Sequence, residues 1–466
     1  MIFLVKNKIR VYAPTPPFKK WCKENLEIPN PEYSKKKRMG LWTGGTPAQI
    51  VLWEKKGSEI HVPYGCREEL QERFPDGRDN LWIDETGLLD VINILPPVPL
   101  YDYQVKATTE MLLHRCGILQ APAGSGKTQM GLNLIASLGK PALWITHTKD
   151  LLNQSRERAE KYWNPELLGT ITEGKVDIGS HVTFATVQTL ARLDLSAYSD
   201  TWDVVIVDEC HRVAGSPTSI TMFYRVLNSL TARYKYGLSA TVHRADGLIR
   251  CCYAMLGREV AIVPKSAVKT TVMPVRIRPK KTGVLISQEC LQTDGMINHA
   301  KLISYLTGNL DRNMQILADI ISEGTLNHSC LILSERVKHL QFLQSILPYD
   351  LLSQSAMIDG TMTSKKEKAK REAALEDMRT GKKKILFATY ALAKEGLDIP
   401  RLDRLFLVTP QKDYAVVTQS IGRIARRFDG KETAVAYDYV DSIQSLVRAY
   451  KRRCTTYRKQ ECIIED

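Results

Sequence analysis

The chain has 466 residues, 44% hydrophobic and 25% charged, which is typical of a globular protein of about three domains. Lys and Arg outnumber Asp and Glu by 65 to 51, so the formal net charge is +14. This excess favours a polyanionic partner such as a nucleic acid, although surplus surface lysine would also produce it. No apolar run approaches the roughly 20 residues that span a bilayer, and no secretory signal is evident. We therefore expect a cytoplasmic protein without a membrane partner, with a monomer favoured.

The ten cysteines include no C-x-x-C pair, and none has a histidine partner at zinc spacing. This pattern is typical of reduced thiols packed as small apolar groups. The sequence therefore predicts no zinc site.

Residues 1–97 differ in composition from the rest of the chain. They hold four of the seven tryptophans and a basic run, Lys35, Lys36, Lys37 and Arg38, close to Tyr33 and Trp42. Cations suit phosphates and rings suit stacking on bases, so this β-rich or α+β domain is predicted to recognise nucleic acid. A solvated loop beside a Trp-rich core is the alternative. The stiff segment 96–99, PPVP, is expected to end the domain.

The stretch Ala121–Thr128 reads APAGSGKT and lies between a short apolar run and a helical pattern. Its glycines allow successive N–H groups to face a phosphate, and the helix N-terminus adds positive potential. Lys127 is expected to reach the β- and γ-phosphates, and Thr128 to bind Mg²⁺. A chance glycine-rich turn is the alternative. The expected nucleotide contacts of this loop are Ala123, Gly124, Ser125, Gly126, Lys127 and Thr128.

A second element of a phosphate site is the apolar strand that ends in Asp208, Glu209, Cys210 and His211. An Asp at the end of a strand supplies the oxygen ligand that Mg²⁺ prefers. Glu209 would then orient or deprotonate the attacking water. These features predict ATP hydrolysis with catalytic residues Lys127, Asp208, Glu209 and His211, although His211 could be a packed imidazole.

Buried strands alternate with helical stretches from Leu100 onward, which predicts an α/β fold with doubly wound parallel sheets. The expected strands are 142–146, 182–185, 204–207, 236–239, 330–333, 384–388, 405–408 and 433–439. We expect domains over 98–265 and 300–466, joined by a connector over 266–299 with two prolines and a basic stretch.

The order of these motifs resembles that of the superfamily 2 helicases of the DExH type, over roughly residues 98–440. The resemblance implies two tandem RecA-like domains that bind ATP between them. It implies adenine recognition by Tyr103 and Gln104 and further nucleotide contacts from Gly396, Asp398 and Gln419. Nucleic-acid contacts would come from Thr146, His147, Thr186, Gln188, Ser334, Arg336 and Thr389. Ser239, Ala240 and Thr241 would couple hydrolysis to strand contact.

Two arginines complete the expected site. Arg423 and Arg426 lie in a Q-x-x-G-R-x-x-R pattern that matches motif VI of the family. A guanidinium stabilises the charge that builds on the γ-phosphate during transfer. Because the two residues are three positions apart, they are expected to share one helix face.

The segment 237–248, GLSATVHRADGL, resembles the extended motif III of XPB-like and bacteriophage UvsW-like DNA helicases, with Val242 where Pro is usual. By this resemblance the partner is DNA, translocation runs 3′ to 5′, and duplex or branched DNA is unwound or remodelled in replication, recombination or repair. The compact size indicates a phage or prophage origin. The alternatives are a DNA translocase without strand separation, an RNA helicase, and a scaffold that uses ATP as a switch.

Overall fold

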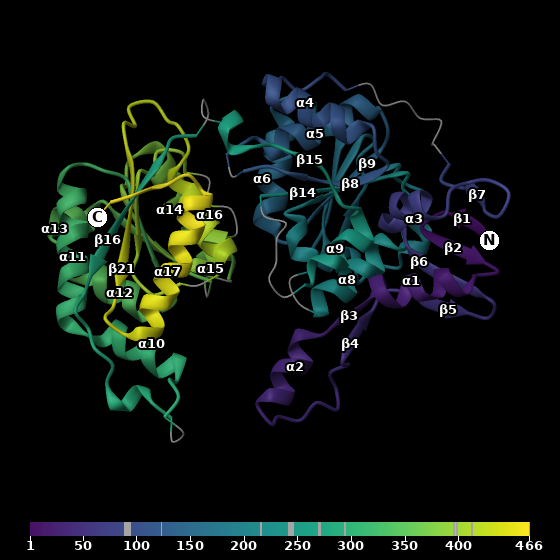
Figure 1. Cartoon of the computed structure of the whole chain (residues 1–466). Coiled ribbons are helices and arrows are strands. Elements are labelled where there is room, and N and C mark those ends of the chain that lie inside the picture. Colours follow the sequence, from purple (N-terminus) through teal and green to yellow (C-terminus); the bar gives the residue numbers. More distant parts are fainter. Residues whose placement is uncertain are drawn as a thin grey trace. The chain divides into compact units, whose positions relative to one another are not determined.

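A computed structural model of the chain describes residues 1–87, 95–122, 124–214, 217–240, 247–268, 272–292, 295–360, 362, 364–394, 397, 399–411 and 413–465. It forms two compact units (Figure 1). The first comprises Met1–Pro122 and Gly126–Ala267, and the second is built from Val268–Asp466. None of the described helices is both long and apolar enough to cross a membrane.

The N-terminal part of the first unit is a small α+β structure. Its five-stranded sheet has the order β5-β6-β2-β1-β7. These strands are β1 (Ile2–Val5), β2 (Lys8–Tyr12), β5 (Glu54–Lys56), β6 (Glu59–Pro63) and β7 (Leu81–Asp84). The helices are α1 (Pro16–Leu26), α2 (Pro31–Arg38) and α3 (Arg67–Arg73), and β3 (Glu27–Pro29) pairs with β4 (Gln49–Val51). Stacked rings of Phe3 and Trp82, with centroids 4.3 Å apart, help to form its core.

The rest of the first unit is a doubly wound sheet of order β11-β10-β12-β9-β13-β14-β8-β15, parallel except for β11. Its strands are β8 (Cys116–Gln120), β9 (Ala142–Thr146), β10 (Leu168–Thr172), β11 (Lys175–Asp177), β12 (Val182–Thr186), β13 (Val204–Asp208), β14 (Tyr234–Ser239) and β15 (Glu259–Ile262). The accompanying helices are α4 (Asp102–Leu112), α5 (Lys127–Leu138), α6 (Lys149–Glu160), α7 (Val187–Leu190), α8 (Pro217–Leu227) and α9 (Ile249–Leu256). Every strand predicted for this sheet is present, because each is a continuous apolar run buried on both faces.

The N-terminal part shares a hydrophobic core with this sheet instead of standing apart behind a linker. One apolar cluster extends from Phe3 and Leu70 to Cys116 and Leu256. The Tyr64 hydroxyl donates to the carbonyl of Arg233 across the junction, at 2.6 Å. The predicted boundary near residue 97 therefore separates two sheets, whereas the hydrophobic core continues across it.

A buried cation strengthens this junction. Lys235 is fully buried, and its Nζ donates to the carbonyls of Leu227, Leu230 and Asn7 at 2.7, 2.8 and 3.3 Å. It also lies 4.7 Å from the ring centroid of Tyr64. The Lys235 amino group thus ties the β1–β2 turn to the end of α8.

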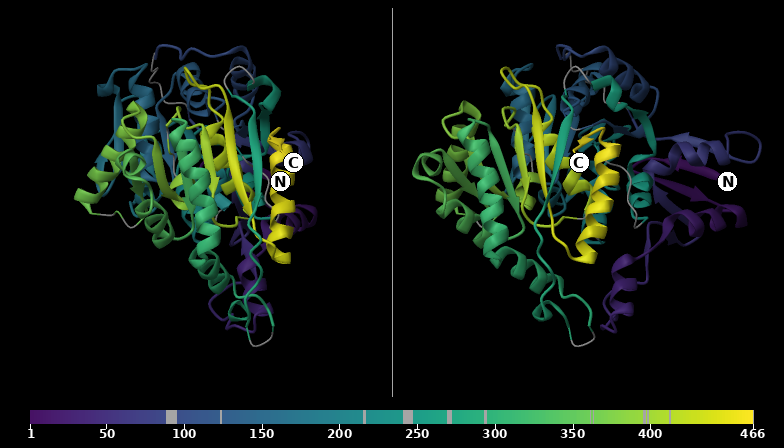
Figure 2. Two further views of the ribbon diagram at one scale, coloured as in Figure 1. Left: turned by 90° about the vertical axis from the view of Figure 1, so that its left-hand side faces the viewer. Right: turned by 60° about the vertical axis from the view of Figure 1, so that its left-hand side comes forward.

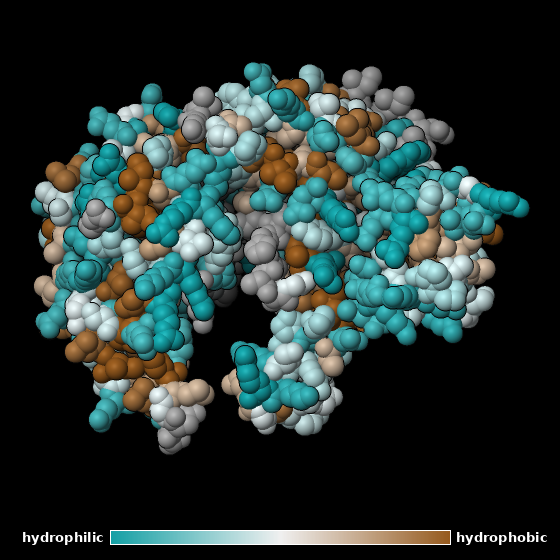
Figure 3. All heavy atoms as spheres, in the orientation of Figure 1, coloured by the Kyte–Doolittle hydropathy of each residue, from teal (hydrophilic) through white to brown (hydrophobic). Residues whose placement is uncertain are grey.

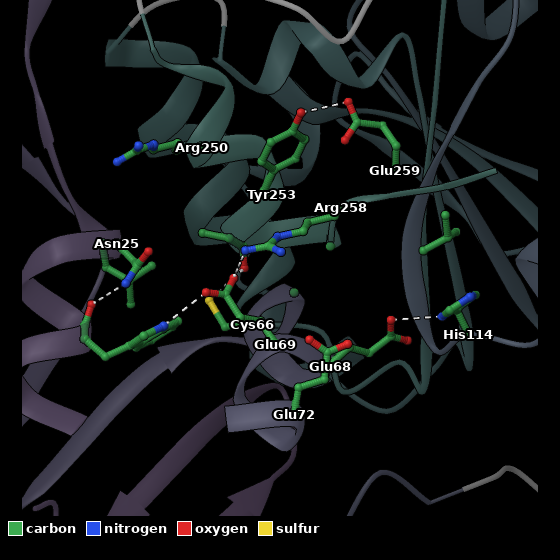
Figure 4. Close-up of a pocket in the computed structure, with 16 residues that line it drawn as sticks. Asn25, Cys66, Glu68, Glu69, Glu72, His114, Arg250, Tyr253, Arg258 and Glu259 are labelled. Carbon is green, nitrogen blue, oxygen red and sulfur yellow. Dashed lines mark hydrogen bonds and ion pairs between the residues drawn. The ribbon is translucent and has the colours of Figure 1, made fainter. Parts of the chain in front are cut away.

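A polar pocket of about 630 Å³ opens at the same junction (Figure 4). Its charged side chains interact with one another: Glu69 contacts Arg258 at 2.9 Å, and Glu68 contacts His114 at 2.9 Å. These pairs join α3 to the sheet of the first unit.

The second unit is a second doubly wound sheet, entirely parallel, with the order β18-β19-β17-β20-β21-β16-β22. Its strands are β16 (Val275–Lys281), β17 (Cys330–Ser334), β18 (Ser355–Ile358), β19 (Ile385–Thr389), β20 (Arg404–Leu407), β21 (Ala434–Val440) and β22 (Ile463–Ile464). Its helices are α10 (His299–Gly308), α11 (Leu310–Thr325), α12 (Val337–Ser345), α13 (Tyr349–Ser353), α14 (Lys365–Thr380), α15 (Tyr390–Lys394), α16 (Tyr414–Ile424) and α17 (Gln444–Lys459). Figure 2 shows helices on both faces of this sheet.

The segment 266–299, expected to be a connector, contributes a strand to this sheet. β16 pairs in parallel with β21 over seven residues and with β22 over two. The sequence VRIRPKK does not predict this strand, because charged residues interrupt its apolar ones. They are tolerated because β16 lies towards the edge of the sheet and exposes Arg276.

A fully buried ion pair fixes the end of this sheet. The Arg312 guanidinium contacts both carboxylate oxygens of Asp441, at 2.7 and 3.3 Å, and donates to the Val408 carbonyl at 2.8 Å. Thr282 donates to the same carboxylate at 2.7 Å. Asp441, Val408 and Thr282 directly follow β21, β20 and β16, and Arg312 lies in the first turn of α11.

Candidate nucleotide and nucleic-acid sites

The loop between β8 and α5 has the geometry of a phosphate cradle. Gly124 and Gly126 have φ of 82° and 78°, a region that side chains disfavour. Gly126 is the N-cap residue of α5, so the first N–H groups of the helix have no intrahelical acceptor. The Ala121 N–H donates to the Ser239 carbonyl at 2.9 Å, which fixes the start of the loop. The arrangement suits a bound phosphate.

Gln104 lies against this loop, as its expected role in nucleotide binding requires. Its side chain is buried, its Oε1 accepts from the Tyr101 N–H at 2.9 Å, and its Nε2 lies where a Cβ on Gly126 would be. Only glycine therefore fits at position 126. The Tyr103 ring stacks on Tyr101 with centroids 5.9 Å apart, beside the same helix start.

The carboxylates at the end of β13 face Lys127. Lys127 Nζ lies 3.9 Å from Glu209 Oε1 and 3.5 Å from the Ala121 carbonyl. Glu209 has a φ of 48°, and its N–H donates to Asp208 Oδ1 at 2.9 Å. A non-glycine residue in the left-handed region is strained, and such strain is typical of functional sites. The predicted catalytic residues Lys127, Asp208 and Glu209 are thus brought together.

The electrostatics of this cluster suit a cation. Burial and the adjacent Glu209 raise the pKa of Asp208 to about 7, and Lys127 opposes that shift. The side-chain hydroxyl of Ser155, on α6, hydrogen-bonds to the same carboxyl group. The Asp208 carboxylate, with the hydroxyl-bearing Thr128 in the first turn of α5, fits the oxygen donor set that Mg²⁺ prefers.

His211 connects the carboxylates to β14. Its Nδ1 lies 3.0 Å from Ser239 Oγ and 3.2 Å from Glu209 Oε2. Ser239 is the last residue of β14, and Ala240 follows it. Ser239, one of the residues predicted to couple hydrolysis to strand contact, therefore lies against His211. His211 in turn lies close to Glu209, the predicted base. Thr241, Ala123, Gly396 and Asp398 lie outside the described residues.

Four residues predicted to contact nucleic acid gather at the ends of β9 and β12. Thr146 and Thr186 are partners in the register of these strands. Gln188 Nε2 donates to the His147 carbonyl at 2.8 Å. Burial lowers the pKa of His147, so the ring is neutral at pH 7. Thr146 is fully buried and donates to the Thr148 carbonyl at 3.0 Å, so its hydroxyl shapes the loop.

In the second unit, Ser334 and Thr389 end the neighbouring strands β17 and β19 and are register partners. Ser334 is fully buried and lies 3.1 Å from His339 Nδ1, which leaves it no access to a ligand in this conformation. The Thr389 hydroxyl is buried and has no partner among the described residues. Arg336 lies on the exposed side, with a 3.5 Å contact to the Ala300 carbonyl.

The expectation that Arg423 and Arg426 share a helix face is wrong. Helix α16 ends at Ile424, and Arg426 forms a β-bridge with Val272. The helix stops there because the Lys431 ammonium group donates to the carbonyls of Ile424 and Arg426. Arg423 remains on α16 and donates to the Leu397 carbonyl at 3.1 Å. The Gln419 Oε1, on the same helix, is buried without a partner among the described residues.

Sequence reasoning missed Ser155 and the Arg312–Asp441 pair. Ser155 lies within a polar helix with no motif around it, so only its position against β13 reveals its contact with Asp208. Asp441 is 129 residues from Arg312 and no local pattern connects the two.

Two protein-family models match the chain. The model of the type III restriction enzyme res subunit matches residues 97–244, and the helicase conserved C-terminal domain matches residues 312–428. Together they cover more than half of the chain. The first match contains all strands of the first doubly wound sheet except β15, and the second contains β17 to β20 of the second sheet.

Similar curated proteins bear helicase or translocase names. A protein of Acanthamoeba polyphaga mimivirus, named as an ATP-dependent RNA helicase, is 25% identical over 75% of this chain and 65% of its own length, slightly under two thirds. The DNA 3′-5′ translocase XPB2 of Sulfurisphaera tokodaii is 24% identical over 73% of this chain and 83% of its own. The ATP-dependent DNA helicase uvsW of Enterobacteria phage T4 is 21% identical over 82% of this chain and 79% of its own.

Among solved structures, Saccharomyces cerevisiae Dbp5 bound to RNA and ADP BeF3 aligns with 78% of this chain and 90% of its own, with a TM-score of 0.52 and 18% identity. At that identity the likeness concerns the fold alone. It confirms the predicted pair of RecA-like domains.

Proposed function

Since the chain belongs to the superfamily 2 helicases and is an ATP-hydrolysing enzyme, we propose that it is a DNA translocase that moves 3′ to 5′ and unwinds or remodels duplex and branched DNA. The observation that carries a motor function is the contact series Lys127–Glu209–His211–Ser239, in which each step is shorter than 4 Å. It joins the phosphate loop to β14, so a change at the phosphate can be transmitted to the segment that follows Ser239.

In this proposal ATP is the substrate. Its phosphates lie on the N–H groups of the 124–128 loop, with Lys127 on the β- and γ-oxygens. Thr128 and Asp208 would hold Mg²⁺, which would neutralise charge on the phosphates. Gln104, packed on Gly126, reads the edge of the base.

Glu209 has the position of the general base. It accepts the proton of the attacking water, and Lys127 Nζ, 3.9 Å from Oε1, orients its carboxylate. His211 Nδ1 lies 3.2 Å from the second carboxylate oxygen. Arg423 supplies the guanidinium that stabilises the developing charge on the γ-phosphate, and we assign Arg426 a supporting role because it lies off the helix.

The proposed nucleic-acid contacts are backbone contacts. The His147–Gln188 pair, Arg336 and Thr389 lie at the carboxyl ends of strands in their sheets, where the doubly wound fold presents ligands. The basic run 35–38 adds phosphate contacts from the N-terminal part. Because phosphates are the target, affinity is expected to fall steeply with salt.

An RNA substrate is the second candidate, favoured by the name of the mimivirus relative. DNA is preferred because residues 237–248 resemble the extended motif III of XPB-like DNA helicases.

The test is the ATPase rate measured with single-stranded, duplex, forked and Holliday-junction DNA and with RNA, together with displacement of the strand from a forked duplex. We expect the largest stimulation with branched or single-stranded DNA and displacement only with a 3′ loading strand. Stronger stimulation by RNA would overturn the DNA assignment. Stimulation without displacement would leave a translocase that does not separate strands.

A further inference from the structure

The N-terminal part carries a projection, residues 30–48, here called the prong. It consists of α2 and the loop that follows, and β3 and β4 connect it to the rest of its unit (Figure 1). Asn30 anchors its base: this residue is fully buried, and its Nδ2 donates to the Pro47 carbonyl at 2.9 Å. No residue of α2 is buried, so the helix adds nothing to a core.

The loop of the prong exposes a tryptophan. The Trp42 side chain is 80% exposed, whereas the other six tryptophans of the chain are buried or half-buried. Its neighbours Met39 and Leu41 are 59% and 54% exposed. A large aromatic surface left in water at the end of a projection is typical of a binding contact.

The indole ring is supported from one side. A Cβ on Gly44 would lie 2.5 Å from Trp42 Cζ2, and one on Gly45 would lie 3.4 Å from Cζ3. The ring therefore rests on the backbone of two glycines, and any side chain at position 44 would displace it. This support orders the ring before a ligand arrives.

Helix α2 of the prong carries exposed cations that lack neutralising partners among the described residues. Lys35, Lys37 and Arg38 are exposed, and none of them forms an ion pair or side-chain hydrogen bond within the described part of the chain. Lys36 differs, because it pairs with Glu32 at 3.0 Å and donates to Thr46 at 2.7 Å. In Figure 3 the prong is mostly hydrophilic, with small apolar areas.

We propose that Trp42 stacks on an unpaired base of the nucleic-acid substrate while Lys35, Lys37 and Arg38 bind the adjacent phosphates. The inference rests on the proposed function, and it deepens that function by assigning the prong to unpaired nucleotides. Bases inside a duplex already stack on one another and present no free face, whereas a single strand or a fork does. The prong therefore contacts the substrate where its strands are separated.

The experiment compares Trp42→Ala and Trp42→Phe in the full-length protein, by fluorescence anisotropy with labelled single-stranded, forked and blunt-duplex DNA. For Trp42→Ala we expect Kd for the single strand and the fork to rise about 5- to 100-fold, as for the loss of one base–aromatic stack. Kd for the blunt duplex should be unchanged, and Trp42→Phe should retain most of the affinity. Tyr349→Ala is the matched control, because Tyr349 is 83% exposed in the second unit.

Salt dependence separates the ring from the cations. Trp42→Ala should leave the slope of log K against log salt unchanged, whereas Lys35→Gln/Lys37→Gln should make it shallower by roughly 1.5. Because these side chains are exposed, the thermal unfolding of all variants should match that of the wild type.

Wild-type affinity of Trp42→Ala for single strands and forks would overturn the inference, as would an equal loss on the blunt duplex. A change of oligomeric state in Trp42→Ala would assign the ring to a protein contact and would also overturn it. If nucleic acid does not stimulate the wild-type ATPase, the proposed function itself fails. If it does, and Trp42→Ala binds normally, only the assignment of the prong fails.

Discussion

His211 Nδ1 lies 3.0 Å from the Ser239 hydroxyl, so the histidine that follows the two acidic residues at the end of β13 is tied to the last residue of β14. The same ring nitrogen lies 3.2 Å from Glu209. The His211 imidazole thus lies close both to Glu209, the predicted catalytic base, and to Ser239, the last residue of β14. In the proposed function, this position of His211 would make hydrolysis and nucleic-acid contact depend on each other.

Ser239→Ala removes this link and leaves the phosphate loop intact. We expect the basal ATPase rate to stay within about threefold of the wild type, while stimulation by single-stranded DNA falls about five- to tenfold, as for the loss of one buried hydrogen bond. Steady-state kcat with and without DNA measures both values. Ser229→Ala is the control, because among the described residues that hydroxyl bonds only to the Arg225 carbonyl near the end of α8. An equal loss of basal and stimulated rates would show that Ser239 serves the chemistry itself.

Glu209→Gln tests the general base. The amide keeps the shape of the side chain but cannot accept the proton of the attacking water, so kcat should fall about 10²- to 10⁴-fold. Binding of a fluorescent ATP analogue should persist, since the phosphate contacts come from the loop and Lys127. Glu157→Gln, an exposed position on α6, should leave both values unchanged. ATP turnover at the wild-type rate in Glu209→Gln would contradict the assigned role.

Most of the two sheets could be predicted from the sequence, because their strands are buried on both faces and are therefore largely continuous apolar runs. The predicted strand 142–146 has the bounds of β9, and the carboxylates predicted to end a strand do so at β13. Phosphate-loop chemistry is equally local, since it depends on glycines and a lysine within eight residues.

Features that depend on distant partners could not be predicted. Lys431 and the bridge between Arg426 and Val272 set the end of α16. The spacing of Arg423 and Arg426 therefore wrongly predicted that they share a helix face. The exposed strand β16 needs β21, more than 150 residues away, as its partner. The shared core of the N-terminal part depends on contacts such as Tyr64 with Arg233. Deletion of residues 1–97 would therefore expose apolar surface of the sheet.

Arg312→Met should destabilise the second unit, because it leaves the Asp441 carboxylate buried and without its guanidinium partner. The expected loss in the free energy of unfolding is about 3–5 kcal/mol. Arg312→Met/Asp441→Leu should recover part of that loss, since no isolated charge then remains in the core. Urea unfolding of the three proteins measures these values. Exposed Arg336→Met, also in the second unit, is the control. A double variant no more stable than Arg312→Met would show that the pair is not the source of the loss.

Lys235 makes the stability of the first unit depend on pH. Burial lowers its pKa to about 7, well below that of a lysine in the unfolded chain. Between pH 7 and about 10 the unfolded chain therefore binds more protons at this position than the folded protein does, so stability rises with pH in this window. Relative to Lys235→Met, the free energy of unfolding of the wild type should increase by about 2 kcal/mol between pH 7 and 9.

Urea unfolding at pH 7, 8 and 9 provides the measurement, and Lys161→Met, at the C-terminal end of α6, is the control whose difference from the wild type should not vary with pH. Three carbonyl oxygens and the Tyr64 ring also stabilise the ammonium form of Lys235, which opposes the effect of burial. A wild-type advantage over Lys235→Met that stays constant from pH 7 to 9 would mean that these contacts keep the side chain charged. In that case the junction between the N-terminal part and the sheet would be held by an ammonium group throughout this range.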